Sequence, residues 1–135
     1  AKNAMGKKAT MNYEAIPSCI YTSPEVGSVG LSEEKAREQF DIQVARFPFH
    51  GCGKALVLNE TYGMVKIISE KESGVVLGVH IIGPHATDII AEAVLGMSMG
   101  MTVNQLAHAI HPHPTLSEAV MESALSLCGG AIHMP

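Results

Sequence analysis

The stretch Met64-Val-Lys-Ile-Ile-Ser69, with Val75-Val-Leu-Gly-Val-His-Ile-Ile82 after it, decides the fold of this chain. Both segments are rich in β-branched residues, and the polar link 70–74 between them is typical of a hairpin turn. Gly83-Pro84 ends the second segment, because proline cannot donate a hydrogen bond to a strand ladder. The sequence therefore predicts an antiparallel β-hairpin here.

On the N-terminal side of this hairpin, the pattern predicts further strands and one helix. Ser32 is a favourable N-cap for a helix that runs to about Phe40 and has glutamates in its first turn. The stretch Gly51–Asn59 opens with glycines and is expected to be irregular. The strands are expected at Ile16–Tyr21, Val26–Leu31 and Ile42–Phe49, the last of which alternates as a half-buried strand does.

On the C-terminal side, the hydrophobic period becomes that of a helix. The apolar residues of Ile89–Met97 fall on one helical face. Capping boxes at Thr102–Gln105 and Thr115–Glu118 open two more helices, and Gly129-Gly130 ends the last one. Strands cluster first and helices last, which predicts an α+β domain with two layers, a mostly antiparallel sheet covered by helices.

Length and composition fit one domain with a sizeable core. The chain has 135 residues, 47% of them hydrophobic, and a formal net charge of −4 with scattered basic residues. Nucleic-acid binding usually needs a clustered basic face, so it is not expected. There is no apolar run long enough for a transmembrane helix and no signal-peptide pattern, so we expect no membrane association.

The cysteines Cys19, Cys52 and Cys128 show no CxxC or CxxxxC spacing. A local redox disulfide and a zinc knuckle are therefore not expected. Three unpaired thiols are typical of a reducing compartment. Cys52, which lies between two glycines, is expected to be exposed.

The most informative chemistry lies in His111-Pro-His113-Pro114-Thr-Leu-Ser-Glu118. The prolines stiffen the loop and push each preceding residue towards an extended conformation. Glu118 falls near the start of the following helix, where its carboxylate could accept a hydrogen bond from one ring nitrogen of His113. The other nitrogen would then be free to move a proton near neutral pH, which suits general acid–base chemistry on a thiol.

Simpler interpretations of the same residues stay open. Glu118 could close the capping box with Thr115, and the two roles can coexist. His113 could be an ordinary surface histidine. A metal site built from His108, His111 and His113 is a third interpretation, although the prolines would splay these ligands.

Three separated segments resemble dihydrolipoamide dehydrogenases. Residues 111–118 resemble that family's C-terminal HxHPTxSE motif, Tyr21–Leu31 is similar to its opening strand and turn, and Gly78–Pro84 with the helix after it is also similar. The resemblance extends over about 13–126. Glutathione reductases carry a similar loop, usually with a second glutamate where Ala119 stands, and a glutathione-reductase-like fragment is the closest alternative.

The resemblance implies a fold, an activity and a place in a larger enzyme. It implies the dimerisation domain of FAD/NAD-linked reductases, in which His113 and Glu118 serve the active site of the partner subunit. That enzyme uses NAD to oxidise protein-bound dihydrolipoamide. His113-Pro114 would lie near the partner's FAD, and a cis bond is expected there. Implied partners are a second copy, the lipoyl domain and the core acyltransferase of 2-oxo acid dehydrogenase complexes, in the bacterial cytoplasm or mitochondrial matrix.

The chain departs from the complete enzyme because it contains no GxGxxG fingerprint and no CxxxxC pair. We therefore expect a fragment, in which 1–12 are the tail of a preceding FAD-domain helix with its linker and 13–135 are the dimerisation domain. Alone it is expected to bind neither FAD nor NAD, to hold no metal and to have no turnover. The alternative from another class is a non-catalytic dimerisation module.

Overall fold

The computed structural model describes residues 1–133 of the chain. Its strands form one sheet in the order β1-β2-β5-β4-β3, and each neighbouring pair is antiparallel. The predicted hairpin is confirmed, since β5 pairs with β4 on one side and with β2 on the other. The strands are β1 (Ser18–Ile20), β2 (Glu25–Gly30), β3 (Ile42–Pro48), β4 (Met64–Glu70) and β5 (Val76–Gly83).

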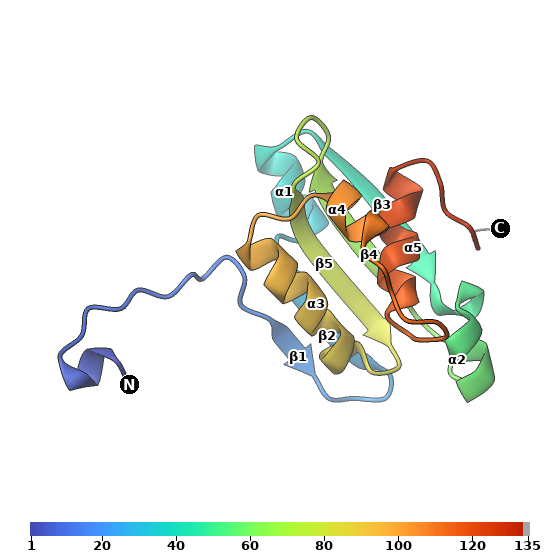
Figure 1. Ribbon diagram of the computed structural model, residues 1–135, viewed down its shortest axis with the longest axis horizontal. Helices are drawn as coiled ribbons and strands as arrows, with labels where there is room; N and C mark the ends of the chain where they lie inside the picture. The colour runs from blue at the N-terminus through green and yellow to red at the C-terminus, as the bar shows by residue number, and fades with distance from the viewer. Residues whose placement is uncertain (134–135) are drawn as a thin grey trace.

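Three helices cover one face of this sheet, which gives the two layers of the predicted α+β class (Figure 1). They are α3 (Ala86–Ser98), α4 (Val103–His108) and α5 (Glu118–Leu127). The remaining helical elements are η1 (Asn3–Met5), α1 (Glu33–Gln39), η2 (Phe49–Gly51) and α2 (Gly53–Leu58). None of the helices in residues 1–133 is both long and apolar enough to cross a membrane.

The main core lies between the sheet and the helical layer. Ile67 and Val79 from the central strands and Val120 from α5 are all fully buried in it. Gly27 on β2 lets α3 approach, because a Cβ there would lie 2.5 Å from the Ala86 carbonyl oxygen. A smaller buried cluster of Ala36, Ile42 and Ile68 includes α1. Because Val120 is buried in the main core, the position of α5 is fixed, and so is the position of the site at the start of this helix.

The segment after β3 contradicts the prediction of an irregular stretch at 51–59. It forms η2 and then α2, which ends where Asn59 takes a left-handed conformation at φ 58°. The reason is local packing, since Ala55 is fully buried although the helix has no side-chain cap. The prediction that Cys52 is exposed is also wrong. Its side chain is buried, and the thiol donates to the Thr115 carbonyl oxygen at 3.4 Å.

The predicted capping boxes have different outcomes. At α4 the box is complete, because Thr102 and Gln105 exchange both side-chain to backbone hydrogen bonds. At α5 only half of it forms. The Thr115 N–H donates to Glu118, but the Thr115 hydroxyl donates to the Pro112 carbonyl oxygen at 2.8 Å. The helix itself begins at Glu118, whereas a full box with Thr115 as the N-cap would start it at Leu116.

Candidate acid–base site

The loop between α4 and α5 carries the candidate site. It leaves α4 at Ala109, whose backbone is extended, and it contains Pro112 and Pro114. Proline fixes its own φ and restricts the residue before it, so the loop offers its histidines in few orientations. The His113–Pro114 peptide bond is cis, as expected from the resemblance.

His113 and Glu118 form the hydrogen-bonded pair that the sequence predicted. The Nδ1 atom of His113 lies 2.8 Å from Oε1 of Glu118, while the other carboxylate oxygen accepts the Thr115 N–H at 2.8 Å. The imidazole is 76% exposed and the carboxylate only 18% exposed. Glu118 therefore has both roles left open by the sequence, because it binds the loop backbone and orients the histidine.

The surroundings of Glu118 keep it ionised. Partial burial alone would raise the pKa of this carboxyl group. The hydrogen bonds from Thr115 and His113, with the charges of His113 and His133, outweigh burial and hold the pKa below its usual value. A carboxylate is an acceptor only, so the Nδ1 atom of His113 must be the protonated one, and Nε2 remains for proton transfer.

His111, two residues earlier, has a different environment. Its Nε2 lies 2.7 Å from Glu92 on α3 and its Nδ1 lies 2.9 Å from the Ala109 carbonyl oxygen, and the side chain is only 5% exposed. Both partners accept, so both ring nitrogens donate and the ring is cationic. The hydrogen bond to Glu92 raises the pKa of His111 although burial opposes it. This pair ties the loop to α3.

The metal interpretation gains no support from the described residues. His108 turns back to its own helix, where Nδ1 lies 2.8 Å from the Asn104 carbonyl oxygen. His111 and His113 are each bound to a different glutamate. Within residues 1–133, no three histidine, cysteine or acidic side chains come together in a way that could hold a metal ion.

A small pocket of about 170 Å³ opens beside the His113–Glu118 pair. It brings together η2, the start of α2, α5 and the segment after α5, which are far apart in the sequence. Sequence reasoning missed the second acidic side chain in this pocket, Glu122, and the second histidine, His133. Its lining is Phe47, Gly51, Cys52, Gly53, Leu56, His113, Glu118, Glu122 and His133.

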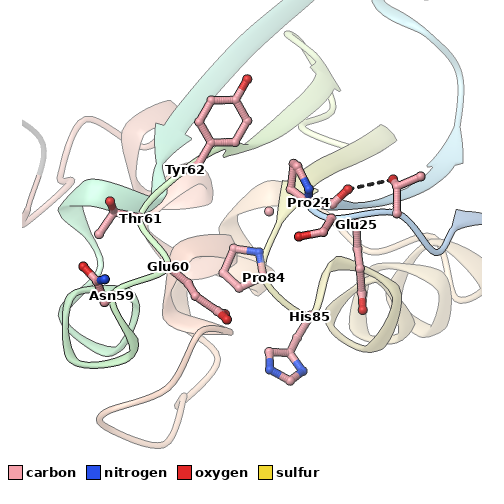
Figure 2. A pocket seen from close by; sticks show the side chains of 11 residues that line it. Pro24, Glu25, Asn59, Glu60, Thr61, Tyr62, Pro84 and His85 are labelled. Carbon is pink, nitrogen blue, oxygen red and sulfur yellow. Dashed lines mark hydrogen bonds between the residues drawn. The ribbon is translucent and has the colours of Figure 1, made fainter.

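A larger cavity of about 470 Å³, which the sequence did not indicate, lies elsewhere (Figure 2). It is formed by Thr22–Glu25, Asn59–Tyr62 and Gly83–His85. The Glu25 carboxylate accepts from the hydroxyl of Thr87 at 2.6 Å and from its N–H at 3.0 Å, and these bonds lower its pKa. The ring of His85 lies 3.5 Å from the carboxylate of Asp88, and Asp88 does not line the cavity. The ion-pair partner of His85 is therefore not one of the acidic residues that line this cavity. The cavity does not repeat the acid–base arrangement of His113.

Two solved structures share this fold. LpdA from Mycobacterium tuberculosis superposes with a TM-score of 0.85 at 24% identity, over 93% of this chain and 28% of that one. The HOCl-induced flavoprotein disulfide reductase RclA from Escherichia coli gives 0.83 at 25% identity, over 92% of this chain and 29% of that one. The fold is thus that of a domain within larger disulfide reductases.

Residues 16–124 match the family model described as the pyridine nucleotide-disulphide oxidoreductase dimerisation domain, and the chain belongs to this family. Its similar relatives are dihydrolipoyl dehydrogenases. The enzymes of Thermus scotoductus, Halobacterium salinarum and Bacillus subtilis are 46%, 44% and 49% identical over 99%, 95% and 87% of this chain. The family match and these relatives confirm the resemblance found in the sequence. It spans only 29%, 27% and 25% of the length of these relatives.

Proposed function

We propose that this domain supplies the acid–base pair of a dihydrolipoyl dehydrogenase, with His113 as the proton carrier and Glu118 as the residue that orients it. The observation that carries the proposal is the asymmetry of the imidazole. Nδ1 is bound to a carboxylate 2.8 Å away, and the ring is 76% exposed with no hydrogen bond at Nε2 among residues 1–133. A second subunit can therefore reach the free nitrogen.

The proton transfer follows from this arrangement. In the oxidative direction, Nε2 of His113 accepts the proton of a dihydrolipoamide thiol and leaves a thiolate, the nucleophilic form of sulfur. The imidazolium that forms is stabilised by the charge of Glu118, whose backbone bond to Thr115 keeps it in place. When the ring returns its proton to a leaving thiolate or to water, the pair is restored.

The flavin and nicotinamide would be held by other parts of the complete enzyme, where they carry electrons away from the dithiol. The residues of this chain would contact the flavin only at the edge of its ring system. His113-Pro114 is exposed, and no hydrogen bond of the described residues uses the His113 carbonyl oxygen. That oxygen can accept a hydrogen bond from an N–H group at the edge of a polar ring. We propose that His113 and Pro114 contact the FAD of a partner subunit in this way.

The same proposal includes the assembly and the substrate. A dimerisation domain places two copies together, and an isologous two-fold interface would let each His113 serve the opposite subunit. The dithiol would be the lipoyl group of a carrier domain bound to the core acyltransferase of a 2-oxo acid dehydrogenase complex. We propose a location in the cytoplasm of a bacterium or in a mitochondrial matrix.

The test is the substitution His113→Gln in the full-length enzyme that contains this chain. We expect oxidation of dihydrolipoamide to fall about 10²-fold or more, the usual scale for loss of a general acid–base group. Flavin reduction by NADH needs no thiol proton and should stay within about twofold. His108→Gln is the matched control, because that ring is hydrogen-bonded to its own helix.

Normal dihydrolipoamide oxidation by His113→Gln would contradict the proposal. The domain would then be a dimerisation module whose histidine is a surface residue. A preference for glutathione disulfide over lipoamide in the unsubstituted enzyme would instead favour the glutathione-reductase-like alternative.

A further inference from the structure

A second histidine–glutamate pair lies beside the first. Glu122 on α5 is 3% exposed, and its side chain accepts the N–H of Ile132 at 2.9 Å, the N–H of His133 at 3.3 Å and Nδ1 of His133 at 2.7 Å. A buried carboxylate is costly unless donors surround it, so these bonds fix the segment 131–133 against α5. The segment also passes η2, since a Cβ on Gly51 would lie 3.1 Å from the His133 carbonyl oxygen.

The two pairs share one helix face and one pocket. Glu118 and Glu122 are four residues apart, which places them one above the other on α5. Both carboxylates and both histidines line the 170 Å³ pocket. Like charges at this spacing repel, so the two acids need separate neutralising partners.

Few other ionisable groups face this pair of acids. Within the described residues, the pocket also contains the Cys52 thiol from the turn before α2. The charge of His111, on the loop before α5, also interacts with Glu118. The His111 ring is hydrogen-bonded to Glu92 on α3, so it does not pair with either acid of the pocket. His133 is therefore the ionisable side chain that is hydrogen-bonded directly to Glu122.

We propose, on the basis of the function above, that Glu122 and His133 are a positioning pair for the acid–base site. Glu122 orients His133 by a hydrogen bond, and the charge of His133 offsets that of the second carboxylate, so that His113 responds to the charge of Glu118 alone. Glu122 is needed in turn because it fastens 131–133 across the pocket. Neither residue touches the thiol, and both act through the charge next to His113.

The proposal is tested by pH profiles of kcat/KM for dihydrolipoamide, measured on the full-length enzyme. His133→Gln leaves the charge of Glu122 uncompensated, so we expect the acid limb of the profile to move up by about half a pH unit. His133→Lys keeps a positive charge, and its acid limb should stay at or below that of the unsubstituted enzyme. The double variant Glu122→Gln/His133→Gln removes both charges and should restore the original midpoint.

The His133 ring is 62% exposed, so the two single variants should keep the fold. His108→Gln controls for the loss of a histidine elsewhere. Equal shifts in His133→Gln and His133→Lys, or no shift in either, would overturn the positioning role while leaving His113 as the acid–base group. Unchanged turnover in His113→Gln would overturn the proposed function, and this inference with it.

Discussion

His111 and His113 stand two residues apart on one loop, and each is bound to a glutamate at nearly the same distance, 2.7 and 2.8 Å. Their environments differ sharply, because the first side chain is 5% exposed and the second 76% exposed. His111 donates from both nitrogens and has no lone pair left for a proton. His113 donates from one nitrogen, and its other nitrogen has no hydrogen bond to the residues that the structure describes.

The difference shows that distance to a carboxylate does not identify a catalytic histidine. The bond from His111 to Glu92 links the loop to α3 and holds one protonation state. The bond from His113 to Glu118 orients a ring that is exposed to solvent. We therefore propose that one pair serves stability and that the other serves proton transfer.

The strongest way to break this comparison is to remove each histidine in turn from the full-length enzyme. We expect His113→Gln to lower dihydrolipoamide turnover about 10²-fold, whereas His111→Gln should lower it by less than about tenfold, because its ring does not transfer the proton. Steady-state kinetics with saturating NAD measure both. Comparable losses in the two variants would remove the functional distinction.

The free energy of unfolding should show the opposite order, with a larger loss in His111→Gln than in His113→Gln. His111→Gln takes a charged, buried hydrogen bond from the loop and should lower the free energy of unfolding by about 1–3 kcal/mol. His113→Gln changes an exposed ring, and its cost should stay below about 1 kcal/mol. Urea denaturation of the 135-residue chain tests this order, and a larger loss in the His113 variant would contradict it.

Glu118→Gln sharpens the comparison at the acceptor. Glutamine can still accept the Thr115 N–H, but it carries no charge to stabilise the His113 cation. We expect turnover to fall about 10-fold or more with the loop structure retained. Glu92→Gln is the matched control and should affect stability more than turnover. The kinetic and denaturation measurements described above apply to both variants.

The smallest expected effect is a pH dependence of stability from His111. Its folded pKa is raised above the ordinary value of 6.5, mainly by the hydrogen bond to Glu92. The stabilisation is then fully present below about pH 6.5 and is lost as pH rises through the folded pKa. Denaturation midpoints should therefore fall above neutral pH in the unsubstituted chain relative to His111→Gln. Parallel pH curves would contradict the assignment.

The sequence predicted the parts of the fold that local patterns determine. The β4 and β5 strands are long β-branched runs, and the Thr102 cap has its Gln105 partner three residues away. The pairing of β2 with β5 joins residues that are far apart in the sequence, from Gly30 with Gly78 to Glu25 with Gly83, and no local pattern specifies it. The α2 helix was missed because it has six residues and begins with a glycine.

The candidate site likewise contains some contacts that local sequence determines and others that depend on long-range packing. The His113–Glu118 pair was predictable because the two residues are only five positions apart, next to a helix start. The partners of His111 and Glu122 are 19 and 11 residues away and meet only after α3 and the segment after α5 have packed. The buried position of Cys52 depends on its contact with Thr115, 63 residues further along the chain.

Glu118 belongs to a helix whose next residues, Ala119 and Val120, are fully buried against the sheet. The eight residues from His111 to Glu118 are therefore not a portable motif. Grafted onto another scaffold or made as a free peptide, they would lose the anchor at Glu92 and the helix that aims the carboxylate. A designer who wants this proton carrier must transplant the whole two-layer domain.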